Sequence, residues 1–187
     1  ILDTFNDWYL VKLYDGYKGW VHSFYLMNIL SEGYKHHIIK TKFSKNSSAI
    51  LSFGTILPII DKIEGKFKSF NPVVDEDWYL INRNQCISKR DEIVYFANQL
   101  LGVPYLWGGR SSFGIDCSGF IQLVLNTTGI IFPRDTSEQI KNKKLFEVDL
   151  KNSLPGDIIF FSNNGSVCHV GFYCGNYEVI QSSGYVR

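Results

Sequence analysis

The segment around Cys117 has the composition of a reactive thiol site. A glycine-rich stretch precedes this cysteine, and an apolar run that can form a helix, Phe120 to Leu125, follows it. A cysteine in the first turn of a helix lies near the positive end of the helix dipole and near free backbone N–H groups. Such groups favour a thiolate, so the position predicts a lowered thiol pKa. The alternative is a buried structural cysteine, since free cysteine is among the most buried residue types.

His169 and Gln181 are the candidate partners of this thiol. Hydrolysis by a cysteine requires an imidazole that takes and returns a proton, and a polar group that orients the imidazole. His169 precedes an apolar, strand-like run, and the other histidines all lie at position 37 or earlier. A turn at residues 175–176 would bring residues 178–182 beside His169, where the Gln181 amide oxygen can accept the Nδ1–H. The alternative for Gln181 is an ordinary strand residue.

Composition excludes several other classes of function. The chain has 187 residues, of which 45% are hydrophobic, and 19 basic against 18 acidic residues leave a net charge of +1. This balance gives no indication of nucleic-acid binding or of an anionic membrane partner. There is no apolar run long enough to span a bilayer. The spacing of the four cysteines indicates neither a metal site nor a disulfide framework, so we expect reduced thiols, no bound metal and no cofactor.

The chain divides into three blocks. In residues 1–31, the strand-like run Trp8 to Leu13, a turn at Asp15-Gly16 and the run Gly19 to His22 predict a β-hairpin. Residues 34–88 contain further short strands, and Asp77 to Leu80 repeats the Asp-Trp-Tyr-Leu of the first block. Short strands at close spacing with Gly and Asn turns suggest small β-barrels.

Residues 89–187 have a different pattern, which predicts an α+β domain. A capped helix is expected over residues 88–102, a second from Cys117 to about residue 129, and a short third over 136–144. Antiparallel strands are expected at 157–161, 169–174 and 178–181, with Asn and Gly turns between them.

Five segments of this last block, in this order, resemble the NlpC/P60 family of cell-wall cysteine peptidases. They are Tyr-Leu-Trp-Gly-Gly, Asp-Cys-Ser-Gly-Phe, Pro-Arg-Asp-Thr-Ser, Pro-Gly-Asp-Ile-Ile-Phe-Phe and His-Val-Gly-Phe-Tyr. The resemblance implies a papain-like α+β fold over residues 89–187. The first two blocks resemble bacterial SH3-type domains, and the first is expected to be incomplete. Further strands usually follow the third catalytic position in relatives, so the end of the last block is expected to be clipped or trimmed.

The resemblance also implies roles for particular residues. The nucleophile falls on Cys117, the base on His169, and the third polar position, commonly His, on Gln181. The positions that match substrate-binding residues are Asp116, Ser118, Tyr105, Asp135 and Thr136.

Asp116 and Arg134 have more than one physical interpretation. A carboxylate beside the thiol raises the pKa of the cysteine, so Asp116 makes more sense as a clamp for a cationic substrate amine. Asp116 is also a good N-cap, and the two roles can coexist. Arg134 is expected to pair either with a substrate carboxylate or with Asp135.

The resulting hypothesis is a cysteine endopeptidase that hydrolyses the γ-D-Glu–diamino acid bond of murein peptides with a free N-terminal L-Ala. One alternative is a peptidoglycan-binding protein whose peptidase domain is weakened or inactive. The reason for considering it is that Gln181 stands at a position where the family commonly has His. Another is an amidase or acyltransferase that uses the same Cys–His pair. The sequence leaves the compartment open between the cytoplasm, where peptides are recycled, and the cell envelope.

Overall fold

The N-terminal block forms a three-stranded antiparallel sheet. The structure, a computed structural model, describes residues 1–26, 35–40, 42–45, 50–59, 61–63, 66–68, 73–75 and 88–187. Strands β1 (Asp3–Phe5), β2 (Trp8–Lys12) and β3 (Lys18–His22) lie in that order, and the 3-10 helix η1 (Ser23–Tyr25) follows. Leu10 pairs with Trp20 across the predicted hairpin. The turn between β2 and β3 contains Gly16 at φ +89°, a left-handed conformation that glycine adopts without strain. The predicted hairpin is confirmed.

The second block contains short antiparallel pairs. Strand β4 (Lys35–Ile38) pairs with β7 (Ile56–Ile59), and β5 (Phe43–Lys45) pairs with β6 (Ile50–Ser52). Strands β8 (Asp61–Ile63), β9 (Lys66–Lys68) and β10 (Val73–Asp75) form a separate sheet. The Asp77 to Leu80 repeat lies outside the described residues. The SH3-like identity of both blocks stays a prediction.

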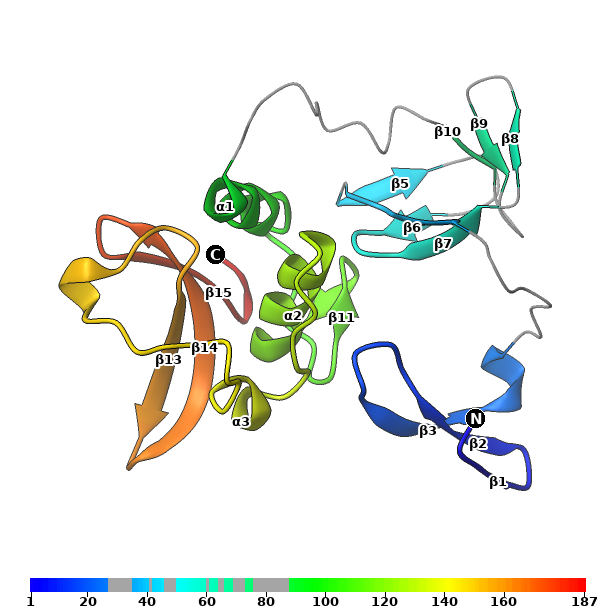
Figure 1. Cartoon of the computed structure of the whole chain (residues 1–187), viewed down its shortest axis with the longest axis horizontal. Coiled ribbons are helices and arrows are strands. Elements are labelled where there is room, and N and C mark those ends of the chain that lie inside the picture. Colours follow the sequence, from blue (N-terminus) through cyan, green and yellow to red (C-terminus); the bar gives the residue numbers. More distant parts are fainter. Residues whose placement is uncertain are drawn as a thin grey trace.

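Helices and a sheet pack together in the C-terminal domain, residues 88–187. The helices are α1 (Lys89–Gln99), α2 (Cys117–Thr127) and α3 (Thr136–Gln139), with the 3-10 helix η3 (Leu150–Asn152). Strands β13 (Ile158–Asn163), β14 (Ser166–Gly175), β15 (Glu178–Ser183) and β16 (Tyr185–Val186) form one antiparallel sheet in that order. Helix α2 lies at the centre, between this sheet and the N-terminal blocks (Figure 1). The predicted α+β domain is confirmed.

Three details of this domain differ from the prediction. Helix α3 is one turn long rather than extending to residue 144, because Asn142 accepts a hydrogen bond from the Lys144 N–H and so forms a local turn that competes with the helix. A short hairpin, β11 (Arg110–Ser111) and β12 (Gly114–Ile115), lies in the glycine-rich stretch before α2, where no strand was predicted. The last strand, β16, was also not predicted.

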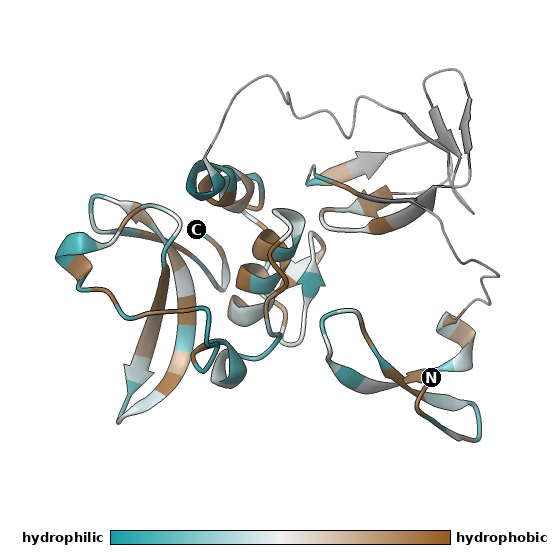
Figure 2. Ribbon diagram, in the orientation of Figure 1, coloured by the Kyte–Doolittle hydropathy of each residue, from teal (hydrophilic) through white to brown (hydrophobic). Residues whose placement is uncertain are grey.

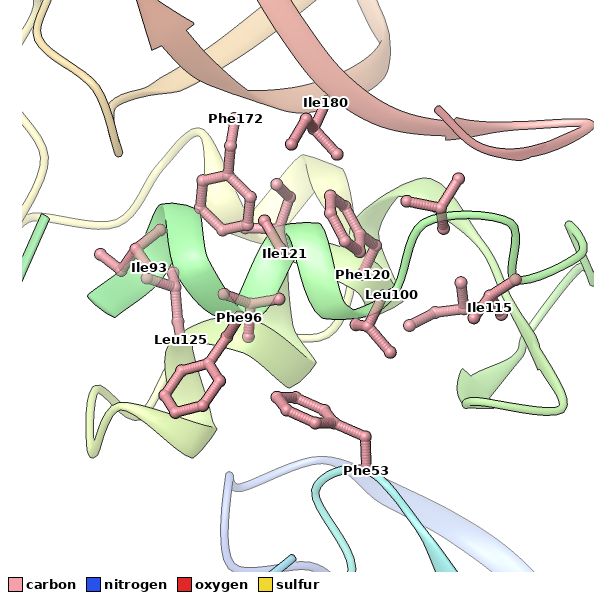
Figure 3. Close-up of a cluster of buried hydrophobic side chains, with 14 of the residues drawn as sticks. Phe53, Ile93, Phe96, Leu100, Ile115, Phe120, Ile121, Leu125, Phe172 and Ile180 are labelled. Atoms are coloured by element: carbon pink, nitrogen blue, oxygen red, sulfur yellow. The ribbon is translucent and has the colours of Figure 1, made fainter. Parts of the chain in front are cut away.

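The hydrophobic core joins α1, α2 and β14, and the apolar residues of these elements gather where they meet (Figure 2). Phe172 and Ile180 contribute from the sheet, and Phe53 enters from the opposite side (Figure 3). Phe53 belongs to the second block, yet it is 1% exposed in this core and its ring lies 5.5 Å from that of Phe96. The second block therefore completes the core of the C-terminal domain.

None of the helices in the described part of the chain is long and apolar enough to cross a bilayer.

Candidate active site

Cys117 is the first residue of α2, and close backbone packing holds it there. The N-cap is Asp116, whose Oδ1 accepts the Gly119 N–H at 2.7 Å. Gly109 and Gly119 pack directly together: a Cβ added to Gly109 would clash with the Gly114 carbonyl, and one added to Gly119 would clash with the Gly109 carbonyl. The glycines around the cysteine are therefore required by the approach of two backbone segments.

The environment of the Cys117 thiol raises its pKa, contrary to the prediction from the helix start. Burial is the largest cause, and the charge of Asp116 is the second. Hydrogen bonding to the backbone of Ser118, Val170 and Cys117 opposes this rise without cancelling it. The contribution of Val170 also shows that the thiol lies against β14, the strand that carries His169.

His169 and Gln181 are hydrogen-bonded, as the hairpin argument predicted. The Gln181 Oε1 lies 2.6 Å from the His169 Nε2, so the contacting ring nitrogen is Nε2 and not the predicted Nδ1. Gln181 stands opposite Gly171 in the sheet register, two residues from His169. Because Gly171 has no side chain, the Gln181 side chain can cross diagonally to the imidazole. Among the described residues no hydrogen bond joins His169 to the Cys117 thiol.

Arg134 holds both residues that flank Cys117. Its Nη2 lies 2.5 Å from the Asp116 Oδ2, and its Nη1 donates to the Asp116 Oδ1 at 3.0 Å and to the Ser118 Oγ at 2.9 Å. All three side chains are buried. Within the protein, Arg134 therefore pairs with Asp116 and not with the adjacent Asp135, while its pairing with a substrate carboxylate stays a prediction.

Asp116 has little remaining capacity for a substrate amine. Its Oδ2 also accepts the Gly108 N–H at 2.9 Å, and its Oδ1 lies 3.3 Å from the Ser118 Oγ. The N-cap interpretation of Asp116 is confirmed. A cationic ligand would have to compete with Arg134 for the same oxygens.

The remaining predicted site residues are Tyr105, Asp135 and Thr136. The pKa of Tyr105 is raised by burial and then by Cys117 and Asp116, while Arg134 lowers it, so the phenol lies within the field of the cluster. Asp135 is the N-cap residue of α3, but it is exposed and its side chain makes no capping hydrogen bond. Thr136 is half-buried at the start of α3. Among the described residues no side-chain hydrogen bond links Asp135 or Thr136 to the cluster, and their role in substrate binding stays a prediction.

The role of Gln139 was not predicted from the sequence. This side chain is completely buried, and its Nε2 donates to the carbonyl oxygens of Ser118 and Pro133, each at 2.9 Å. It therefore links the first turn of α2 to the segment that carries Arg134. Gln139 ends a short polar run at the start of α3, and such runs are common on solvent-exposed helices. No sequence pattern therefore marked Gln139 as buried. Nowhere in the described part of the chain do three or more His, Cys, Asp or Glu side chains gather as metal ligands would.

Comparison with known proteins identifies relatives of this arrangement. Over 181 residues the chain is 33% identical to a gamma-D-glutamyl-L-lysine dipeptidyl-peptidase of Bacillus subtilis. The aligned region covers 89% of this chain and 60% of the relative. A Bacillus cereus protein of the same name is 27% identical over 213 residues, covering 97% of this chain and 63% of the relative. The chain thus spans about three fifths of the length of these relatives.

Solved structures show that the fold is shared. An NlpC/P60 family protein from Bacillus cereus superimposes with a TM-score of 0.80 at 24% identity, covering the whole of this chain and 72% of the other. The model of the NlpC/P60 family matches residues 102–187, the segment that holds Tyr105, Cys117, His169 and Gln181. The chain therefore carries a domain of the NlpC/P60 family.

Proposed function

We propose that this protein is a cysteine peptidase that hydrolyses the γ-D-Glu–diamino acid bond of murein peptides with a free N-terminal L-Ala. The observation that carries the proposal is the thiol of Cys117, which lies at a helix start against the strand of the hydrogen-bonded pair His169–Gln181. Two relatives are named for a γ-D-glutamyl-L-lysine bond and as dipeptidyl-peptidases. A dipeptidyl-peptidase releases two residues from a free amino end, which agrees with L-Ala-γ-D-Glu as the product.

The tautomer of His169 favours a general-base mechanism. The Gln181 amide oxygen is an acceptor, so the Nε2 of His169 carries a proton and Nδ1 is left as the basic nitrogen. Because burial and Asp116 raise the thiol pKa, Cys117 is mainly protonated near neutral pH and requires this base. Nδ1 takes the thiol proton as sulfur attacks the scissile carbonyl carbon.

The later steps use the same two groups. The His169 imidazolium returns its proton to the leaving amine of the diamino acid, the C–N bond breaks, and a thioester to Cys117 remains. Water, deprotonated by the same imidazole, then hydrolyses the thioester and restores the thiol. Backbone N–H groups at the start of α2 and the Tyr105 hydroxyl are the proposed donors to the oxyanion.

Cleavage of L-Ala-γ-D-Glu-L-Lys, followed by mass spectrometry, tests the proposal. The protein should release L-Ala-γ-D-Glu and lysine, and Cys117→Ala should slow release by at least about 10³-fold. Cys168→Ala, which removes an exposed thiol from β14, is the matched control and should retain activity. Equal rates for Cys117→Ala and the unmodified protein would refute the mechanism. Products cut at a different amide would instead indicate the amidase or acyltransferase alternative.

A further inference from the structure

Cys117 and the pair His169–Gln181 belong to elements that are far apart in the sequence. Cys117 begins α2 shortly after β12, whereas His169 and Gln181 lie on β14 and β15. Within the described residues the imidazole is hydrogen-bonded to Gln181 and not to the thiol. The separation of thiol and imidazole is therefore set by contacts between the elements that carry them.

Ser182 makes a contact of this kind. Its side chain is completely buried, and its Oγ donates a hydrogen bond to the Ile115 carbonyl oxygen at 2.8 Å. Ile115 is the last residue of β12 and lies two positions before Cys117, while Ser182 directly follows Gln181. One hydroxyl therefore connects the segment that leads into the nucleophile with the strand that carries the partner of the base.

Backbone pairing holds the strand of Ser182 on both sides. Gln181 stands opposite Gly171 on β14, and on its other side it exchanges two backbone hydrogen bonds with Arg187, each at 3.0 Å. In the turn between β15 and β16, the Gly184 carbonyl accepts the Tyr105 N–H at 2.9 Å. The end of β15 and the turn after it therefore contact three parts of the site: the orienting amide, the proposed oxyanion donor and the segment before the nucleophile.

We propose that Ser182 is a positioning residue for the Cys117–His169 pair, and that its hydroxyl fixes the segment before the nucleophile against the strand of Gln181. This role rests on the proposed function for the reaction that the pair performs. Because Ser182 is completely buried, it acts through Ile115 and Gln181 and does not contact the substrate. A displacement of about 1 Å in a catalytic group can lower the rate by about 10²-fold, so a link of this kind affects catalysis directly.

Ser182→Ala tests this role, with Thr128→Val as the matched control. Both changes remove a buried hydroxyl that donates to a carbonyl oxygen at 2.8 Å, but Thr128 follows the C-terminal end of α2, where it bonds to Leu125. In Ser182→Ala the Ile115 carbonyl still accepts the Leu106 N–H, so no buried group is left unpaired and the variant should fold.

Steady-state kinetics on L-Ala-γ-D-Glu-L-Lys gives the first measurement. Ser182→Ala should lower kcat by about tenfold with little change in KM, because a misplaced catalytic group still allows the substrate to bind. Thr128→Val should keep kcat, even if urea denaturation shows that the two variants lose similar stability.

Alkylation of Cys117 by iodoacetamide measures the same geometry without a peptide substrate. Because burial and Asp116 raise the thiol pKa, alkylation near neutral pH depends on transfer of the thiol proton to His169. Ser182→Ala should therefore slow alkylation near neutral pH by about tenfold. Above the thiol pKa the thiolate forms without the base, so the variant should then react as fast as the unmodified protein. A loss of stability alone would not produce this dependence on pH.

The two measurements distinguish the role of Ser182 from the proposed function. Unchanged kcat and alkylation in Ser182→Ala, or equal losses in Ser182→Ala and Thr128→Val, would overturn the positioning role. A higher KM at constant kcat would also contradict it. If the unmodified protein cleaves no tripeptide but Ser182→Ala still slows alkylation only near neutral pH, the proposed function fails and the positioning role stands.

Discussion

Asp116 is the residue whose charge most directly affects the nucleophile. It caps α2, pairs with Arg134 and raises the pKa of the Cys117 thiol, a combination that stabilises the helix start but disfavours the thiolate. An acid at the N-cap is favourable for the helix dipole, but the same negative charge opposes ionisation of the thiol. In the mechanism proposed above, the thiol does not need to ionise in advance, because His169 takes its proton as the sulfur attacks.

We expect Asp116→Asn to shift the pH dependence of Cys117 alkylation to lower pH. The substitution removes the like charge while Arg134 remains, so the thiol ionises more readily and iodoacetamide reacts faster at a given pH below the thiol pKa. Peptide mapping by mass spectrometry resolves Cys117 from the other cysteines. Asp135→Asn, at an exposed carboxylate near the site, is the control and should leave the profile unchanged. An unchanged profile in Asp116→Asn would show that its charge does not reach the sulfur.

Gln181→Ala should lower kcat by about 10²-fold with little change in KM. Loss of the amide oxygen frees the His169 ring to rotate, and misplacement of a catalytic group by about 1 Å has an effect of this size. Steady-state kinetics on the tripeptide measures the two constants. Ser183→Ala, on the same strand, is the control. Full activity in Gln181→Ala would mean that sheet packing alone orients the imidazole.

At the scale of elements, the loop after β6 and the β11–β12 hairpin support each other. The Phe53 N–H donates to the Ser112 Oγ at 3.1 Å, and the Ser112 N–H donates to the Ser52 Oγ at 2.8 Å. The β11–β12 hairpin leads directly into Asp116 and Cys117, so the second block helps to place the nucleophile.

Phe53→Ala should lower the free energy of unfolding by about 3–5 kcal/mol, the usual effect of truncating a buried phenylalanine. Urea denaturation followed by circular dichroism measures this loss. Ile50→Ala, at a residue that is 54% exposed on β6, should change stability by less than about 1 kcal/mol. If both variants unfold at the same urea concentration, the second block is not part of the core of the C-terminal domain.

At the scale of the whole molecule, the N-terminal hairpin is fixed to the C-terminal domain by polar contacts. Besides the Asp15 contacts, the Tyr14 hydroxyl accepts a hydrogen bond from the Asn126 Nδ2 at 2.9 Å. These contacts place the hairpin turn against α2, and the turn forms one wall of a cavity that Arg134 also lines.

Asp15→Ala should raise the KM of the tripeptide by about tenfold with a smaller change in kcat. It leaves Arg110 without its partner and releases the hairpin wall, and a lost charged hydrogen bond is equivalent to a factor of this size. Faster limited proteolysis within residues 1–26 should accompany the change. Asp7→Ala, at an exposed residue in the turn between β1 and β2, is the control. An unchanged KM would indicate that the hairpin takes no part in substrate binding.

Local patterns predicted much of the fold. The hairpin of the first block, the starts of α1 and α2 and the three main strands of the C-terminal sheet follow from caps, turns and hydrophobic runs over a few residues. The pairing of His169 with Gln181 was also accessible, because a short turn between two strands restricts the register. The length of α3 could not be predicted in this way, since the Asn142 side chain accepts the Lys144 backbone N–H and so competes with helical hydrogen bonding.

The sequence by itself thus determined the chemical groups, Cys117, His169 and Gln181, and the helix and strands that carry them. Only the tertiary structure decided how the charges pair. Arg134 lies 18 residues from Asp116 and selects it over the adjacent Asp135, and Asp15 meets Arg110 and Gln122 across about half of the chain. The rise in the pKa of Cys117 has the same origin, because burial and neighbouring charge depend on which segments the fold brings together.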